Sequence, residues 1–440
     1  MSYTANAPQR HAFKLIFVPL LIFSLFAQCA VVWTQLDYVR DGYFDFVLYY
    51  SGAKILNDGN GAKLFDLEAQ REYQKGFGAS YKDRDLPFNH PPYELLPLLV
   101  LAKFSFSVAH VLWTSVNILL LAIVLVRLFP FIETTHRSLF ALMLFAYFPT
   151  ITALKMGQDS VVTTLLLAET FVSLKHQRYT IAGGLLAVGL YKPQFVLPLL
   201  GILLWHGRWR SLFGFLSVGL LLGAISLAMV GRDGLVGLIS LWLPMIERGN
   251  VVWPELMTNL RGLIYMTMQP GGLAEATNVV TLLFSILTYV TTLQLWRRDA
   301  EENNELFDLR FAAAIVMTAL VSFHSYSYDG TLLVIPLVIM LNQVLKAAGP
   351  YPARHRMFLA LLFAWFVPLV PNVLLSAAIL AWWALPLPIL FGVIATEIWR
   401  RSAGRFETRR FPSLNAVDPT KRFIGQAFPR GIYGASDRRH

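Results

Sequence analysis

The chain has few charged residues and almost no cysteine, and each shortage excludes a class of protein. Only 15% of its 440 residues are Asp, Glu, Lys or Arg, whereas a soluble domain carries roughly 25%. Cys29 is the single cysteine, which excludes an intramolecular disulfide and a metal site built from cysteines. The sequence also lacks the glycine-rich phosphate loop, the His-Glu-x-x-His zinc motif and the nucleophile elbow that mark many soluble enzymes.

Apolar residues are abundant instead, and they occur in long runs. They make up 56% of the chain, with runs such as FKLIFVPLLIFSLFAQCAVVW and SVNILLLAIVLVRLF. Runs of this kind cross a hydrocarbon core of about 30 Å. The first run lacks a small-x-small cleavage site, so we expect a retained helix rather than a signal peptide. The sequence therefore predicts an all-α polytopic membrane protein.

The positions of the basic residues predict the topology, because short loops rich in Lys and Arg stay in the cytoplasm. Such loops lie at 127–137, 175–178, 206–210, 297–310 and 346–356. With these loops and both termini inside, about twelve transmembrane helices are expected, near 13–34, 107–126, 138–154, 160–174, 180–191, 194–205, 212–230, 273–296, 311–323, 331–346, 357–371 and 375–398. Much of the net charge of +10 lies in the tail 400–440, which suits an anionic inner leaflet rather than a nucleic acid.

This topology leaves two long segments on the extracytoplasmic side. The first is 35–106, of which the part 91–106 is interrupted by Pro97 and Lys103 and is short for a full crossing. We therefore expect a re-entrant or interfacial helix there, with a cavity beside it. The second segment is 231–272.

Three short polar turns, LKMGQDS, YKPQF and FHSYSYDG, fall on the same side. Each joins two short apolar stretches, so the turns are expected below the membrane surface, lining a wet cavity. Ionisable residues at that depth are rare and tend to be functional, although any one alone is more often a solvated loop residue. The ionisable residues that converge here are Lys155, Asp159, Lys192, His324 and Asp329.

Longer strings resemble a known family. They are DFVLYYSGAKILNDGNGAKLFD, FNHPPYELLPLLVLAKFSFSVAHVLW, MGQDSVVTTLLL, AGGLLAVGLYKPQFVLPLLGILLWHGRWR, MTNLRGL and SFHSYSYDGTLLVIPLVIML. Their order and spacing resemble glycosyltransferase family 87, whose members are polyprenyl-phosphate-mannose-dependent alpha-(1-2)-mannosyltransferase-like enzymes. The resemblance covers nearly all of the chain up to about residue 400. It implies a GT-C fold over residues 1–399, with juxtamembrane helices in a long first extracytoplasmic loop, followed by the cytoplasmic tail 400–440.

The resemblance also implies a reaction. A mannose-like hexose or a pentose would pass, with inversion, from a polyprenyl-phosphate donor to a glycolipid or glycan of the cell envelope. This would occur at the outer side of a bacterial inner membrane. The aspartate that matches the family pattern D-F-x-x-Y-Y is Asp45, the implied catalytic base, whereas Asp41 lies outside it. We expect membrane lipids as surroundings, and no cofactor, metal or nucleic acid.

Other polar residues fit further roles in such a transfer. Cations stabilise the charge that grows on a phosphate leaving group, and the candidates are Lys192, Arg261 and His324. The candidates for substrate binding are Tyr49, Tyr50, His90, Glu94, Gln158, Asp159, Gln194 and Asp329. Ordinary explanations also exist: Asp45 as a helix cap in an interfacial aromatic belt, and Arg261 or His324 as structural residues.

Two other functions fit the same cavity. A transporter or flippase of a lipid-linked or polar solute would use it without chemistry, although the long first loop and the absence of an obvious internal repeat argue against this. A non-catalytic subunit of an envelope assembly is the other alternative, and there Asp45 would be dispensable. Solute counterflow without a covalent product would favour the transporter.

Overall fold

The structure is a computed structural model that describes residues 7–78, 86–133, 137–247, 253–273, 276–296, 305–346, 351–369 and 384–410. Within these segments the secondary structure consists of 18 α-helices and short 3-10 helices, without a β-strand. The predicted all-α fold is therefore confirmed.

The helices follow one another with short connections. The earlier ones are α1 (Ala7–Thr34), α2 (Leu36–Arg40), α3 (Phe46–Asn57), α4 (Leu67–Gln74), α5 (Leu96–Leu101), α6 (Phe106–Leu128), α7 (Arg137–Ala146), α8 (Phe148–Met156) and α9 (Ser160–Lys175). The later ones are α10 (Tyr179–Val188), α11 (Pro193–Trp205), α12 (Trp209–Glu247), α13 (Leu260–Met268), α14 (Thr277–Leu295), α15 (Glu305–Val321), α16 (Val334–Leu345), α17 (Tyr351–Phe366) and α19 (Pro386–Arg410). The 3-10 helices that concern the site are η3 (Pro92–Leu95), η6 (Gly189–Tyr191) and η10 (Ser327–Leu333).

Several helices have the length and composition of membrane spans. Among the described residues these are Phe106–Phe131, Trp209–Leu243, Thr277–Leu295 and Ser327–Leu345, and the pair α7 and α8, bent by 52°, would make a fifth. Large apolar side chains on them point outward: Leu220 is 75% exposed and Leu283 61%. Such surfaces suit lipid rather than water, so the chain is an integral membrane protein. The total of about twelve crossings stays a prediction.

The helix predicted at 212–230 ends at a kink in α12. Gly231 has φ 68° and ψ −176°, a non-helical backbone conformation that glycine adopts at no steric cost, and it separates two helical stretches within Trp209–Glu247. The apolar sequence after it, LVGLISLWL, lies in the second stretch. The first part of the predicted second loop, 231–272, is therefore helical.

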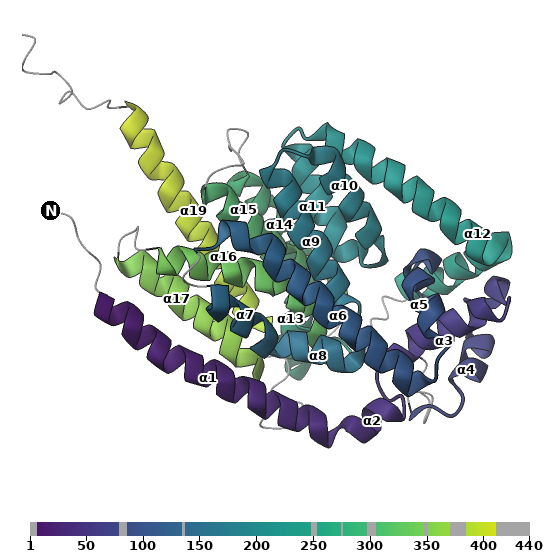
Figure 1. The fold of residues 1–440 in the computed structure, drawn as a ribbon. Coiled ribbons are helices and arrows are strands. Elements are labelled where there is room, and N and C mark those ends of the chain that lie inside the picture. The colour runs from purple at the N-terminus through teal and green to yellow at the C-terminus, as the bar shows by residue number, and fades with distance from the viewer. Residues whose placement is uncertain are drawn as a thin grey trace, which may run out of the picture. The chain divides into compact units, whose positions relative to one another are not determined.

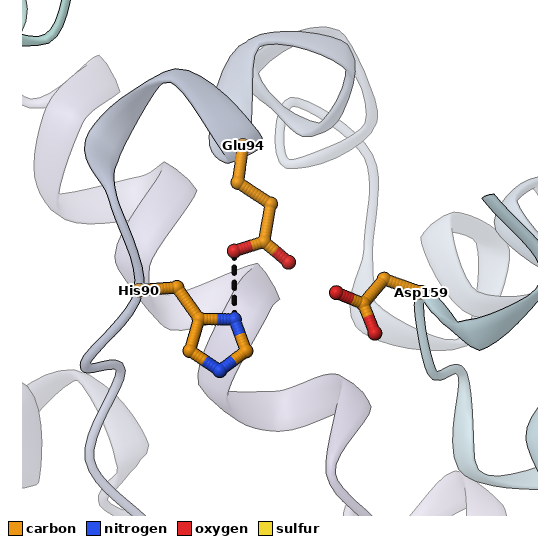
Figure 2. Close-up of side chains that lie close together, drawn as sticks. All are labelled: His90, Glu94 and Asp159. Carbon is orange, nitrogen blue, oxygen red and sulfur yellow. Dashed lines mark hydrogen bonds and ion pairs between the residues drawn. The ribbon is translucent and has the colours of Figure 1, made fainter. Parts of the chain in front are cut away.

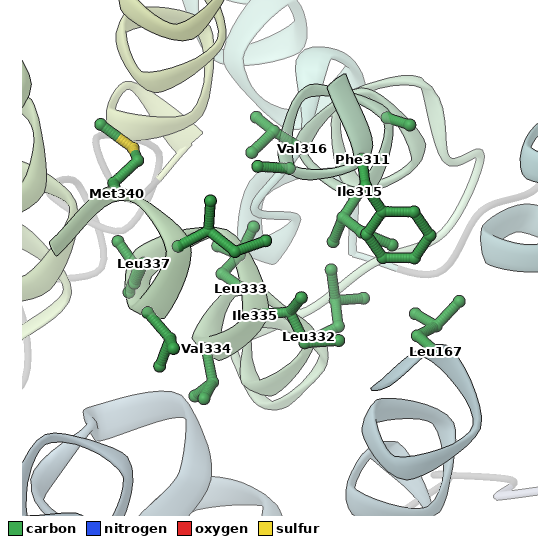
Figure 3. Packing of buried hydrophobic residues seen from close by; sticks show 14 of the residues in the cluster. Leu167, Phe311, Ile315, Val316, Leu332, Leu333, Val334, Ile335, Leu337 and Met340 are labelled. Atoms are coloured by element: carbon green, nitrogen blue, oxygen red, sulfur yellow. The ribbon is translucent and has the colours of Figure 1, made fainter. Parts of the chain in front are cut away.

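The central core is formed by short apolar helices that are buried on most sides. Phe311 and Ile315 of α15 pack near Leu332 of η10 and Leu167 of α9 (Figure 3). Because lipid tails are as apolar as these side chains, close packing rather than exclusion of water holds such helices together. This core fixes the ends of α9 and η10 relative to each other.

A second cluster holds the segment between α1 and α6. Its helices α3, α4 and α5 gather beside the far part of α12 (Figure 1). Phe46 and Val47 of α3, together with Leu238 of α12, belong to one buried cluster. Gly61 lies so close to α12 that an added Cβ would be 2.2 Å from the Met229 carbonyl oxygen. The expected helix in 91–106 is present as η3 and the six residues of α5.

By its internal contacts the chain divides into residues 1–398 and 399–440. Within the second unit, only the end of α19 is described, and the basic tail after residue 410 lies outside the described residues.

Candidate active site

Asp45 precedes the first turn of α3 but does not cap it. Its side chain makes no capping hydrogen bond, and its Oδ2 instead accepts one from Nε2 of Gln158 at 2.5 Å. One turn later, the Tyr49 hydroxyl donates to Oε1 of the same glutamine at 3.1 Å. The capping explanation for Asp45 therefore does not hold, because the carboxylate faces a residue 113 positions away.

Burial changes the acidity of Asp45. Removal from solvent raises the pKa of its carboxyl group, while the hydrogen bond from Gln158 and the positive charge of Lys192 act in the opposite direction and only partly compensate. A carboxylate whose pKa lies above its usual value is a stronger base than a solvated one. The environment thus suits proton abstraction from a hydroxyl group.

The turn between α8 and α9 carries two of the predicted residues, Gln158 and Asp159. Gly157 ends α8 with φ 68°, the left-handed conformation that favours glycine at a helix end. Its carbonyl accepts a hydrogen bond from the indole of Trp113 at 2.9 Å, which fixes the turn against α6. An added Cβ on Gly157 would lie 2.6 Å from Cβ of Phe46. This close approach brings Gln158 to Asp45.

Lys192 is buried and lies between two carboxylates. Its Nζ is 2.6 Å from Oδ1 of Asp159 and 2.6 Å from Oδ1 of Asp329, and it donates to Oγ of Ser160 at 2.8 Å. Burial alone lowers the pKa of this ammonium, but the two carboxylates outweigh it and the pKa rises. Lys192 is therefore charged, and its charge is already matched within the protein.

Asp329 is held by the backbone of its own 3-10 helix. Its Oδ2 accepts from the amide of Tyr326 at 3.1 Å, which is a capping arrangement. Its Oδ1 accepts from both Lys192 and Ser160. Ser160 is not among the predicted site residues, although its place directly after Asp159 was a signal for it. Tyr328, whose ring centroid is 5.4 Å from Nζ of Lys192, is also not among them.

His90 and Glu94 form a third group beside Asp159. Nδ1 of His90 is 2.7 Å from Oε2 of Glu94, and one ligand atom from each of His90, Glu94 and Asp159 lies within 4.8 Å of the others. Figure 2 shows the three side chains converging from η3, the segment before it and the start of α9. Burial, and then the charge of Asp159, holds the pKa of Glu94 well above its usual range. The three groups have the donor atoms of a metal site.

The other predicted phosphate ligands lie around the loop before η10. Nε2 of Gln194 donates to the carbonyl of His324 at 3.1 Å. Burial lowers the pKa of His324 to about 4, so this imidazole is neutral near pH 7 and would bind a phosphate by hydrogen bonding. Arg261 lies in the first turn of α13, donates to Asn278 at 3.0 Å, and acts electrostatically on His324.

Tyr50 has a different environment from the other predicted residues. Its hydroxyl donates to the carbonyl of Phe104 at 2.8 Å, and its ring packs edge-on against Phe106. These contacts join α3 to the start of α6. A role for Tyr50 in substrate binding stays a prediction, while its structural role is visible.

The arrangement brings together a candidate base, Asp45, a buried charged network around Lys192 and polar side chains. The model of glycosyltransferase family 87 matches residues 88–322, more than half of the chain; Asp45, His324 and Asp329 lie outside that match. No curated protein and no solved structure matches the chain. The matched residues include the turn that binds Asp45, the three-residue group of Figure 2 and Lys192. On this match, the chain belongs to glycosyltransferase family 87.

Proposed function

We propose that this glycosyltransferase moves a sugar, with inversion, from a polyprenyl-phosphate donor to a glycolipid or glycan of the cell envelope, on the extracytoplasmic side. The acceptor hydroxyl oxygen attacks the anomeric carbon as the bond from that carbon to the phosphate oxygen breaks. The hydroxyl proton passes to Asp45, and the polyprenyl phosphate leaves with the bonding electrons. Because phosphate is already a good leaving group, the reaction needs no protonating acid of the glycosidase type.

The observation that carries the proposal is the environment of Asp45. Its carboxyl group has a raised pKa and accepts a hydrogen bond from Gln158, a residue of the family match. A base needs both a suitable pKa and a fixed direction, and Gln158 supplies the direction. Tyr49, bonded to the same Gln158, is buried and would help to hold that glutamine toward Asp45.

A lipid-linked donor agrees with the setting in the membrane. Its isoprenoid chain would lie among the outward-facing apolar side chains of the spans, and its phosphate at headgroup level. Arg261 and the neutral His324 are the candidates for contact with that phosphate. Lys192, already bound by Asp159 and Asp329, would act on the phosphate through the field of the network rather than as a free cation.

The test is transfer of radiolabelled sugar from a panel of polyprenyl-phosphate sugars by purified protein, with membrane lipid extract as acceptor. Asp45→Asn should abolish transfer while the variant keeps its thermal midpoint and its elution on gel filtration. The matched control is Asp41→Asn, because Asp41 is an exposed acid in the same segment and should tolerate the change. Equal product from wild type and Asp45→Asn would remove the base assignment.

A further inference from the structure

We propose that His90, Glu94 and Asp159 form a binding site for one divalent metal ion, such as Mn²⁺ or Zn²⁺, within the candidate active site. The sequence pattern gives no such indication, because His90 and Glu94 are four residues apart and Asp159 follows much later. The fold brings their ligand atoms to within 4.8 Å of one another. Bonds to such an ion are about 2.0–2.2 Å long, so the groups need to close by less than about 1 Å.

Buried carboxyl oxygen atoms point into this group. Oε1 of Glu94 is buried and accepts from no donor among the described residues; the Glu94 side chain is only 6% exposed and hydrogen-bonds to the carboxylate of Asp159 when Glu94 is protonated. Figure 2 shows the Glu94 oxygen that is not bonded to His90 on the side that faces Asp159. Oδ2 of Asp159 is likewise buried. Two buried carboxyl groups that face each other cannot both be ionised without a positive partner, and an ion between them would take the place of the proton that they share.

The charges of the site give an independent reason. Four carboxyl groups, those of Asp45, Glu94, Asp159 and Asp329, interact electrostatically with the ammonium of Lys192. The ammonium of the nearby Lys155 has other partners: its Nζ donates to Oε1 of Gln35 at 2.8 Å and lies 5.0 Å from the ring centroid of Phe44. Clustered carboxylates in a buried site need counter-charge.

A doubly charged ion would displace the proton from Glu94 and balance the charges of the Glu94 and Asp159 carboxylates. Lys192 would then balance Asp329, and Asp45 would remain as the carboxylate free to act as a base.

The donor set selects the kind of ion. One imidazole nitrogen and two carboxylates suit Zn²⁺ or Mn²⁺, whereas Ca²⁺ prefers six to eight oxygen ligands. Three protein ligands leave positions open for an oxygen of the substrate. On the proposed function, which this role presupposes, that oxygen belongs to the donor phosphate. The hydrogen bond between His90 and Glu94 would be exchanged for bonds to the ion.

Binding of Mn²⁺ alone tests the site without any sugar donor. Purified full-length protein in nanodiscs is titrated with Mn²⁺, and the free ion is measured by electron paramagnetic resonance. We expect one ion per chain. In Glu94→Gln and in His90→Gln the Kd for Mn²⁺ should be at least about tenfold higher than in wild type. The control is Glu72→Gln, because Glu72 is an exposed acid of α4 and should leave the affinity unchanged.

The outcomes separate the site from the proposed function. Absence of Mn²⁺ binding to wild type at millimolar concentration overturns the site, as does equal affinity in Glu94→Gln and Glu72→Gln when both elute as folded protein. If protein stripped of metal with EDTA transferred sugar as fast as Mn²⁺-loaded protein, the ion would have no role in catalysis. Ion binding that follows the expected pattern, without transfer from any polyprenyl donor, would retain the site and reject the proposed donor.

Discussion

At the scale of single residues, the structure separates acids that resemble one another in sequence. Asp41 and Asp45 are four positions apart, yet the first is exposed and the second accepts a hydrogen bond from Gln158. Asp159 lies at the start of α9 without capping it and instead binds Lys192. In each case a contact distant in sequence decides the role of the residue, and spacing alone could not reveal it.

The hydrogen bond from Gln158 predicts a shift in the pH dependence of transfer. Donation to the charged form of Asp45 lowers the pKa of that carboxyl group, so its loss in Gln158→Leu should raise the pKa further. Because the base must be ionised, the acidic limb of the plot of kcat against pH should move to higher pH. An exposed glutamine changed in the same way, Gln269→Leu, serves as control. An unmoved limb in Gln158→Leu would mean that Asp45 is not the titrating base.

Lys192 should be required for stability as well as for activity. Replacement by Met removes the cation between two buried carboxylates, and breaking one side of a buried ion pair costs about 3–5 kcal/mol. The measurement is unfolding by SDS in mixed micelles. Adding Asp329→Asn to Lys192→Met should recover part of the loss, because one uncompensated charge disappears. A double variant as unstable as the single one would show that the pairing is not the cause.

At the scale of elements, the turn between α8 and α9 decides the geometry of the site. Gly157→Ala should destabilise the protein and lower transfer, because the residue has φ 68° and its Cβ would meet Phe46. The control is Gly59→Ala, where φ is 76° but nothing lies within 4 Å of the added Cβ. Both variants carry the backbone cost of about 1–2 kcal/mol, so the difference between them measures the contact with Phe46. If Gly157→Ala and Gly59→Ala lost stability and transfer to the same extent, the close contact between Gly157 and Phe46 would not be what positions Gln158.

The sequence predicts most of the helices because apolar runs and breaks are local features. The range 107–126 corresponds to α6, Phe106–Leu128, and 194–205 to α11, Pro193–Trp205. The helical stretch after Gly231 was not predicted, because the positive φ of this glycine breaks the first stretch and redirects the chain into a second one. The partners within the site were also missed. Ser160, for example, joins Lys192 and Asp329 only through packing of α9 against η10.

At the scale of the whole molecule, the three groups of the site come from segments that belong to different packing clusters. Asp45 lies beside Phe46 of the cluster around α3, whereas Asp329 lies between Tyr328 and Leu332 of the central core. The turn 157–160 contacts both, through Gln158 and Ser160. On the proposed function, a substrate bound between these groups would contact both clusters, so the first loop and the bundle would both be required for transfer.

The proposed topology places this whole arrangement on the extracytoplasmic side, and labelling can test it. Cys29 is the single cysteine, so a Cys29→Ser background accepts one new cysteine at a time. Glu72→Cys on α4 and His176→Cys after α9 are both exposed positions on loops predicted to face opposite sides. A membrane-impermeant maleimide should label position 72 in intact spheroplasts and position 176 only after lysis. The reverse pattern would put Asp45 in the cytoplasm, where nucleotide sugars are available, and would remove the main reason for a lipid-linked donor.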